Sequence, residues 1–144
     1  MISLVRAGLG WLPPEVRRTA SLLSNELEAV DVAIRGHDEV VLHNDFHEGN
    51  FVLDRPVGRI SGIWDFSCVQ TGSVSFDLRY LDGTSRDLNR RVARHYTSIT
   101  GRRVDLRAAV VANRVENVAD AIETGRRDLL DAALARWAKV DAGS

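Results

Sequence analysis

The amino-acid sequence predicts an α+β fold that is mostly α. Two observations point to this class. Apolar residues recur at spacings of three and four before residue 36 and again after residue 85, which is typical of helices that bury one face. Between residues 39 and 64 the apolar runs are short and are separated by turn-forming residues, which is typical of strands.

A long helix is expected first. Pro13 and Pro14 favour a helix start, because the fixed φ angle of proline suits the first turn. Gly36 is suited to end the helix, since glycine adopts the left-handed backbone found at helix C-termini. The positions that share one face of this helix are Val16, Ala20, Leu23, Leu27, Val30 and Ile34.

The central segment predicts three short strands. Glu39–Leu42 is a β-like run that leads into a polar stretch. Phe51–Leu53 and Ile60–Trp64 are two further apolar runs, and residues 54–58 between them have the composition of a turn. We expect the last two runs to pair as a β-hairpin.

The remainder of the chain predicts helices. Ser75–Leu81 is expected to form a short one. Ser85 and Asp105 are candidate N-caps of two longer helices, which Gly101 and Gly125 would end. Residues 128–140 complete the set.

Composition excludes several function classes. The chain has 144 residues, 44% hydrophobic residues and a net charge of −1, so it has no basic excess for a nucleic-acid polymer or a membrane surface. No run of 18 apolar residues predicts a membrane span, and the apolar first twelve residues lack the pattern of a signal peptide. The single cysteine, Cys68, excludes an intramolecular disulfide and favours a reducing, cytoplasmic location. We expect Cys68 to be a small buried residue.

The polar stretch after the first strand carries the chemistry. His43 to Asn50 fits the pattern H-x-D-x-x-x-x-N, and Asp65 follows an apolar strand fifteen residues after Asn50. The Asp45 carboxylate can take the proton of a hydroxyl group, and the Asn50 amide oxygen and the Asp65 carboxylate are ligands that Mg²⁺ prefers. The hairpin returns the chain, so Asp65 is expected near Asn50.

These residues resemble the aminoglycoside phosphotransferase and choline kinase superfamily, which has a protein-kinase-like fold. The segments LHNDFHEGNFVLD, GRISGIWDFS and Phe76-Asp77-Leu78 carry the resemblance, which extends weakly over most of the chain. It implies the C-terminal lobe of that fold, with helices around a small β-hairpin that carries the catalytic loop. It also implies a kinase that uses Mg²⁺ with ATP or GTP to phosphorylate a hydroxyl of a small molecule. An aminoglycoside-like antibiotic, and hence antibiotic resistance, is one possibility; another metabolite is equally allowed.

The resemblance also implies roles for individual positions. Asp45 matches the catalytic base, and Asn50 and Asp65 match the metal ligands. His43 and Asp77 match positions that support the catalytic loop. The chain departs from the family pattern at Asn44, where Gly is common, at Glu48, where Pro is common, and at residues 73–74, where Asp-Pro is frequent.

Other residues remain open between function and structure. His47 matches a frequent histidine of small-molecule kinases, and both substrate contact and loop packing explain it. Glu116 and Asp120 lie one helical turn apart with Glu123 close by, so they can attract a cationic acceptor or form a solvated helix face.

A complete kinase of this type has a preceding N-terminal lobe with a phosphate-covering loop and a phosphate-binding lysine. The only lysine here is Lys139, and no glycine-rich phosphate loop precedes His43. We therefore expect one domain, residues 1–144, that corresponds to the C-terminal lobe without the N-terminal lobe. Its parts are a helical segment (1–38), the catalytic loop and hairpin (39–66) and a helical subdomain (67–144).

Two functions remain possible on this basis. The chain is part of an active phosphotransferase, or it is a non-catalytic module that retains the lobe as a ligand-binding or interaction unit. In either case the face that normally meets the N-terminal lobe would be uncovered. We expect Val41, Phe51 and Trp64 to be partly exposed and to favour self-association or binding of a missing N-terminal lobe.

Overall fold

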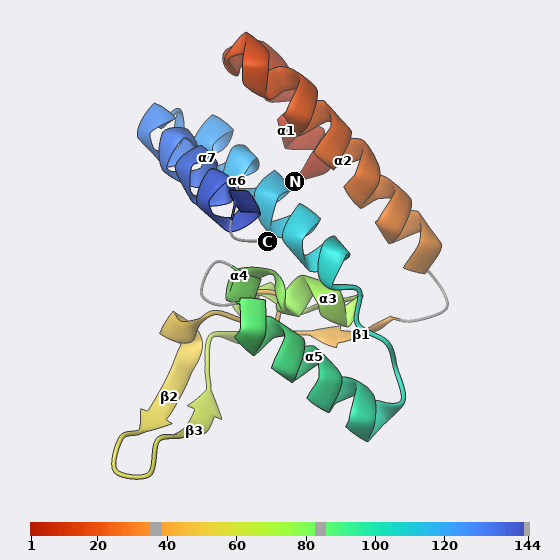
Figure 1. The fold of residues 1–144 in the computed structure, drawn as a ribbon, viewed down its shortest axis with the longest axis vertical. Coiled ribbons are helices and arrows are strands. Elements are labelled where there is room, and N and C mark those ends of the chain that lie inside the picture. Colours follow the sequence, from red (N-terminus) through yellow and green to blue (C-terminus); the bar gives the residue numbers. More distant parts are fainter. Residues whose placement is uncertain (35–38, 83–85, 143–144) are drawn as a thin grey trace. The chain divides into compact units, whose positions relative to one another are not determined.

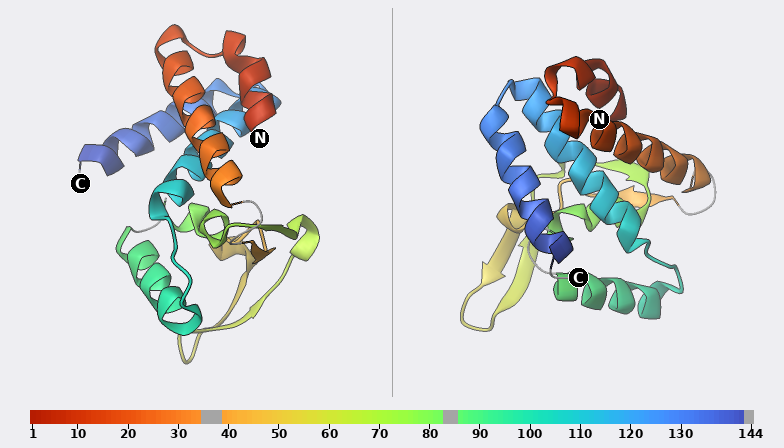
Figure 2. Two further views of the ribbon diagram at one scale, coloured as in Figure 1. Left: turned by 90° about the vertical axis from the view of Figure 1, so that its right-hand side faces the viewer. Right: turned by 45° about the horizontal axis from the view of Figure 1, so that its top comes forward.

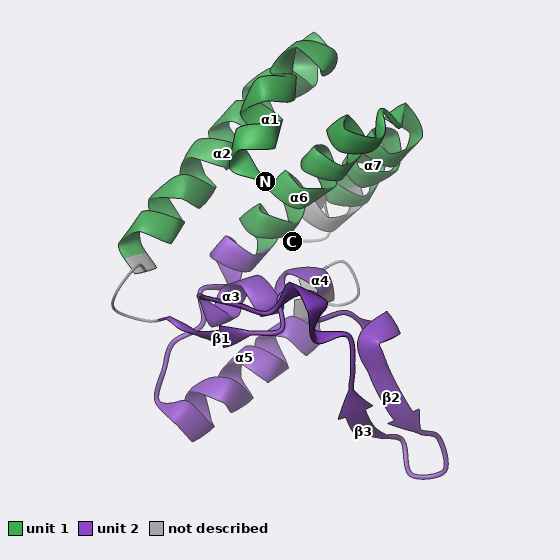
Figure 3. Cartoon of the chain, turned by 180° about the vertical axis from the view of Figure 1, so that it is seen from behind, with its two compact units in different colours: residues 1–33, 110–144 green, residues 34–109 purple. Residues whose placement is uncertain are grey.

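The computed structural model describes residues 1–34, 39–82 and 86–142 (Figure 1). The chain divides into two compact units (Figure 3). Unit 1 comprises residues 1–33 and 110–144, and unit 2 comprises residues 34–109. The fold is α+β and mostly α, as the sequence predicts. The expected helix end at Gly36 and the expected N-cap at Ser85 lie outside the described residues.

Unit 1 is helical. It contains α1 (Ile2–Gly8), a short 3-10 helix η1 (Leu9–Trp11), α2 (Pro14–Ile34), most of α6 (Leu106–Thr124) and α7 (Arg127–Ala142). The helix α2 begins at Pro14 as expected. The left-handed backbone of Gly125, with φ +66°, ends α6.

The core of unit 1 is built from the apolar faces of these helices. Small residues are prominent in it, which lets helix backbones approach closely. The buried residues are Val5, Leu12, Val16, Ala20, Leu27, Val111, Ala112, Val115, Val118, Ala119, Ala121, Leu130, Ala133 and Trp137. Polar contacts also join the helices: Arg6 pairs with Glu28 between α1 and α2, and Arg136 donates to Asn117 between α7 and α6. The right-hand view of Figure 2 shows α6 and α7 side by side.

The helix α1 is absent from the sequence prediction, which treats the first twelve residues only as an apolar stretch. The segment forms a helix because it packs one side on unit 1. Val5 is fully buried, and Gly8 approaches the side chain of Ile122 on α6 closely.

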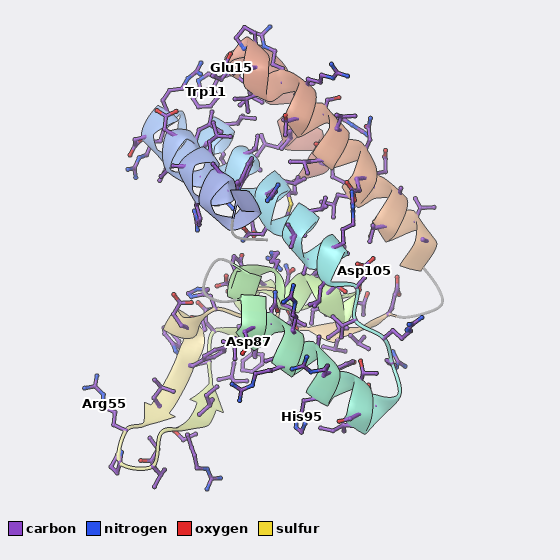
Figure 4. All side chains as sticks on the ribbon, viewed as in Figure 1. Trp11, Glu15, Arg55, Asp87, His95 and Asp105 are labelled. Atoms are coloured by element: carbon purple, nitrogen blue, oxygen red, sulfur yellow. The ribbon has the colours of Figure 1, made fainter. Side chains whose placement is uncertain are left out.

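Unit 2 begins with β1 (Val40–Leu42), η2 (Glu48–Asn50), β2 (Phe51–Asp54) and β3 (Arg59–Ile63). Strands β2 and β3 form the predicted antiparallel hairpin, which Figure 2 shows as an extended arm with Arg55 near its tip (Figure 4). Its register pairs Phe51 with Ile63 and Asp54 with Arg59, with an irregularity after Val52.

The second part of unit 2 contains η3 (Phe66–Cys68), β4 (Gln70–Gly72), α3 (Val74–Asp77), α4 (Arg79–Asp82) and α5 (Arg86–Thr100). Strand β4 pairs antiparallel with β1, and the sequence prediction missed it. The run Gln70–Gly72 has only one β-branched residue and no apolar alternation, so its pairing depends on a partner distant in sequence. The predicted helix Ser75–Leu81 is two short helices, α3 and α4, with a break at Leu78.

Helix α5 and the start of α6 pack around Leu78, which lies between α3 and α4. Leu78, Ala93 and Ala109 are buried together, with Val92, Val104 and Leu106 against them. Asp105 caps α6 as predicted, because its carboxylate accepts hydrogen bonds from the backbone N–H groups of Arg107 and Ala108 (Figure 4).

None of the helices in the described part of the chain combines the length and apolar character that crossing a bilayer requires.

Candidate functional site

The loop formed by residues 43–50, here called loop 43–50, starts where β1 ends. Strand β1 is held by β4 through the pairs Val41–Thr71 and Leu42–Gln70, and Leu42 is buried. The loop ends in the helical turn η2, after which β2 begins directly. Regular structure on both sides therefore fixes the two ends of the loop.

His43 is buried and connects loop 43–50 to the segment that follows β3. Its Nε2 atom lies 2.8 Å from the carbonyl oxygen of Trp64, so Nε2 carries the proton and donates it. Its ring packs at 4.7 Å, between centroids, from that of Phe66. The other ring nitrogen, Nδ1, is buried and has no hydrogen-bond partner among the described residues. His43 therefore holds, by a hydrogen bond, the peptide group that directly precedes Asp65.

Asp77 supports loop 43–50 from the end of α3. Its two carboxylate oxygens accept the backbone N–H groups of His43, at 3.1 Å, and of Asn44, at 2.7 Å. Such bonds to a carboxylate are among the stronger neutral-to-charged hydrogen bonds. The structure thus brings His43 and Asp77 to the same loop.

Asp45, His47 and Asn50 meet within the loop. The amide nitrogen of Asn50 donates to both the carbonyl oxygen and the Oδ2 atom of Asp45, each at 2.9 Å. The Nε2 atom of His47 lies 3.5 Å from Asp45 Oδ2, while its Nδ1 accepts the backbone N–H of Gly49. Because Nδ1 accepts, the proton of the neutral ring is on Nε2 and faces Asp45.

The backbone of Asn50 reaches the third predicted residue. Its carbonyl oxygen accepts the N–H of Trp64 at 3.1 Å, and Trp64 is adjacent to Asp65 in the chain. His43 also contacts the Trp64 carbonyl oxygen. Both the N–H and the carbonyl group of Trp64 are therefore bonded to residues of loop 43–50. Asp65 is thereby tethered beside the loop that carries Asp45 and Asn50.

Asp65 itself is exposed and has a left-handed backbone, with φ +59°. Its Oδ1 atom accepts the hydroxyl of Ser67 at 2.6 Å and, more weakly, the Ser67 N–H at 3.4 Å. These bonds, with smaller attractions from His43 and His47, lower the pKa of Asp65 below its ordinary value. The carboxylate stays ionised and points away from the core.

The donor set suits a hard cation. In the described residues, no cluster of three or more His, Cys, Asp or Glu side chains has the arrangement of a metal site. The amide NH₂ of Asn50 is directed at Asp45, and the amide oxygen accepts no hydrogen bond from the part of the chain that the structure describes. An amide oxygen and an ionised carboxylate match Mg²⁺, which commonly takes only one or two protein ligands and completes its shell with water and phosphate.

The comparison with known protein families covers the residues of this site. The model of the phosphotransferase enzyme family matches residues 4–139. The chain belongs to the phosphotransferase enzyme family. A search of curated proteins and a search of solved structures each found no significant match.

Membership of the phosphotransferase enzyme family gives the site a chemical context. The match spans both units and includes the whole of loop 43–50 and Asp65. At the level of the family, the activity is transfer of a phosphoryl group. Asp45, Asn50 and Asp65 are therefore found together in a chain whose relatives act on phosphates.

Arg79 belongs to this site and was missed by the sequence analysis. It is 3% exposed, and its guanidinium donates to the carbonyl oxygen of Asn44 at 2.6 Å and to the Asn44 side-chain oxygen at 3.2 Å. It also donates to the Tyr80 hydroxyl and lies over the Tyr80 ring. A weak signal was present, because Arg79 follows Asp77-Leu78 inside an otherwise apolar stretch of the sequence.

Glu116 and Asp120 lie on α6 in unit 1, outside the unit that carries Asp45, so their contact with a substrate stays a prediction. The expectation that Cys68 is buried is wrong: Cys68 is exposed. It lies in the short surface helix η3 after Asp65 rather than in a strand, so no sheet face covers it.

Proposed function

We propose that unit 2 carries the acceptor-activating and metal-binding half of a small-molecule kinase. The reaction is transfer of the γ-phosphoryl group of ATP or GTP to a hydroxyl group. One observation carries the proposal: the Asn50 amide bonds to the Asp45 carboxylate while the Asn50 carbonyl holds the backbone beside Asp65. Three residue types that phosphoryl transfer requires are thus linked through one asparagine.

Asp45 is proposed as the base that accepts the proton of the hydroxyl. Its side chain is 30% exposed, so a substrate can reach it. Oδ2 is engaged by Asn50 and faces His47, whereas Oδ1 accepts no hydrogen bond from the residues that the structure describes. The free oxygen can accept and orient a hydroxyl group, and the fixed one keeps the carboxylate from rotating.

Asn50 and Asp65 are proposed as ligands of Mg²⁺. When bound with the nucleotide, the cation neutralises charge on the transferring phosphates. Asp65 contributes a carboxylate that the Ser67 hydroxyl keeps ionised, and Asn50 contributes its amide oxygen. His43 and Asp77 hold the loop in register, since both bond to the backbone around these residues.

The finer assignments follow from the resemblance. Residues 1–144 are proposed to correspond to the C-terminal lobe of a protein-kinase-like fold, with the catalytic loop in unit 2. The acceptor is proposed to be a hydroxylated small molecule, either aminoglycoside-like or another metabolite. Glu116 and Asp120 are proposed to attract a cationic acceptor of this kind.

The test is phosphoryl transfer from γ-labelled ATP and GTP, with Mg²⁺, to a panel of aminoglycosides and polyhydroxylated metabolites. We expect Asp45→Asn to lower kcat by about 10²- to 10⁴-fold, because it removes the proton acceptor and keeps the shape. Asp54→Asn removes an exposed carboxylate on β2 and is the matched control, which should leave kcat unchanged. Equal activity of Asp45→Asn and the unmodified chain would contradict the role of Asp45.

A further inference from the structure

Asn44 has an unusual backbone at a sensitive position. Its φ angle is +63°, in the left-handed region that residues with a Cβ atom rarely adopt. It directly precedes Asp45, so its φ and ψ angles set the direction in which the chain presents the Asp45 side chain. Asparagine tolerates this region better than most residues, but it does not enforce it.

The backbone N–H, the backbone carbonyl and the side-chain oxygen of Asn44 are held by two side chains, Asp77 and Arg79. Its N–H donates to Asp77 Oδ1. Its carbonyl oxygen accepts from Arg79 Nη2 at 2.6 Å, and its side-chain oxygen accepts from Arg79 Nη1 at 3.2 Å. The two nitrogens of one guanidinium therefore hold the backbone and the side chain of the same residue.

Arg79 is itself anchored. Its Nη1 donates to the carbonyl oxygen of Phe76 at 2.6 Å, which ties it to α3. Only 3% of the residue is exposed. A planar, rigid group with several donors is suited to such a fixed, two-pronged contact, whereas the single ammonium of lysine is not.

The contacts continue to the other side of the loop. Arg79 Nη2 donates to the Tyr80 hydroxyl at 3.0 Å, and the guanidinium lies 4.3 Å from the centre of the Tyr80 ring. The Tyr80 ring packs edge-on against His47 at 5.7 Å, and His47 faces Asp45. Arg79 thus reaches the residue before Asp45 directly and a residue after it through Tyr80.

We propose that Arg79 is a positioning residue that holds Asn44 in the left-handed conformation and thereby fixes Asp45 for phosphoryl transfer. This inference rests on the proposed function, which it extends by one residue. It explains how a residue with a Cβ atom occupies this left-handed position: the guanidinium supplies the restraint that selects the conformation. It predicts that the two residues act as a pair.

The experiment is a double-mutant cycle. The variants are Arg79→Gln, Asn44→Gly, the double variant, and Arg79→Lys, which keeps the buried charge and loses the fork. Arg102→Gln is the matched control, because Arg102 is exposed and donates to the carbonyl oxygen of Glu39 away from the loop. Two quantities are measured for each: the kcat and KM of phosphoryl transfer, and the ¹³Cα and ¹³Cβ chemical shifts of residue 44.

We expect Arg79→Gln and Arg79→Lys to lower kcat about tenfold or more, with the KM for nucleotide within about twofold. In the Asn44→Gly background the same changes should cost less than about threefold, since glycine reaches the left-handed region without help. The shifts of Asn44 should lose their left-handed signature in the Arg79 variants that melt like the unmodified chain. Arg102→Gln should change neither quantity.

Equal losses of kcat in the two backgrounds would overturn the pairing of Arg79 with Asn44. An unchanged left-handed signature of Asn44 in Arg79→Lys or Arg79→Gln would overturn it independently. The chemical shifts need no turnover, so they decide the inference even if the unmodified chain transfers no phosphoryl group. A lack of phosphoryl transfer by the unmodified chain would count against the proposed function. The chemical shifts alone would then decide whether Arg79 positions Asn44.

Discussion

Asp65 shows how local contacts keep a single carboxylate ionised. Its left-handed backbone turns the chain after β3, and its carboxylate caps the short helix η3 through Ser67. The hydroxyl of Ser67 lowers the pKa of Asp65, so the ionised form persists to lower pH than for an ordinary aspartate. Oδ1 is used for this bond, and Oδ2 accepts no hydrogen bond from the residues that the structure describes, so it is the oxygen proposed to bind a ligand.

Ser67→Ala tests this arrangement. Without the hydroxyl, the pKa of Asp65 should rise toward that of an ordinary aspartate. A lowered pKa means that the contribution of the ionised group is complete above the ordinary pKa and is lost as pH falls through the folded value. The acidic limb of Mg²⁺ binding should therefore move to higher pH in Ser67→Ala.

The measurement is a ¹³C NMR titration of the Asp65 carboxyl carbon, with the exposed Asp54 carboxyl as internal reference. An unchanged midpoint for Asp65 in Ser67→Ala would show that Ser67 does not set its pKa.

At the scale of single residues, the sequence indicated which residue types form the candidate site. It did not indicate which contacts hold them in place. Asp45, Asn50 and Asp65 were recognisable because phosphoryl transfer requires a base and oxygen ligands at a limited spacing. The bonds from Arg79 to Asn44 join residues 35 positions apart, so only the folded chain brings them together. The expectation that Cys68 is buried was wrong for a similar reason, because burial depends on which part of the folded chain covers a residue.

At the scale of elements, the close packing of α1 against α6 illustrates a requirement for glycine. A Cβ atom on Gly8 would lie 2.5 Å from Ile122 Cγ2, closer than atoms can approach. Gly10, two residues later in η1, has no atom of the described residues within 4 Å of the equivalent position. The two glycines thus differ in the space available for a side chain.

Gly8→Ala should therefore destabilise unit 1, by about 1–3 kcal/mol, because the extra methyl group forces Ile122 or α1 to move. Gly10→Ala is the matched control and should change stability by less than about 0.5 kcal/mol. Urea unfolding followed by circular dichroism measures both. Equal midpoints for the two variants would refute the close contact of α1 with α6.

Long elements with strong periodicity were predictable, and short ones were not. Helices α2, α5, α6 and α7 and the hairpin β2–β3 follow from apolar spacing, caps and turn residues within the segments themselves. Strand β4 and helix α1 depend on distant partners, β1 and α6, and lack such local signals. The break between α3 and α4, at Leu78, directly follows Asp77, whose carboxylate accepts hydrogen bonds from the backbone of loop 43–50.

At the scale of the whole molecule, unit 2 exposes many apolar side chains. Val41 and Trp64 are 74% and 54% exposed, as expected for an uncovered face, while Phe51 is half-buried. Further exposed apolar residues lie in the hairpin and in the segment after it. These are Val52, Leu53, Val57, Ile60, Ile63, Phe66 and Val69. Exposed apolar surface of this extent favours association with another protein surface.

We expect the chain to self-associate through this surface at micromolar concentrations. Leu53 and Ile60 are opposite each other in the hairpin register and both are exposed, so they lie on one face. Replacing both with threonine keeps the β-propensity and should shift the chain toward monomer in sedimentation velocity. Val32→Thr with Ile99→Thr, two exposed apolar residues on helices, is the control. A concentration-independent monomer for the unmodified chain would contradict the prediction.

The central claim is that Asn50 and Asp65 form a Mg²⁺ site that binds together with a nucleotide. Calorimetry of ATP and GTP binding, with and without Mg²⁺, tests it on the unmodified chain, on Asp65→Ala and on the control Asp54→Ala. We predict binding that requires Mg²⁺, is retained in Asp54→Ala, and is weakened tenfold or more in Asp65→Ala, which corresponds to about 1.4 kcal/mol. Binding that is independent of Mg²⁺, equal affinity in Asp65→Ala, or no binding by the unmodified chain would contradict the claim.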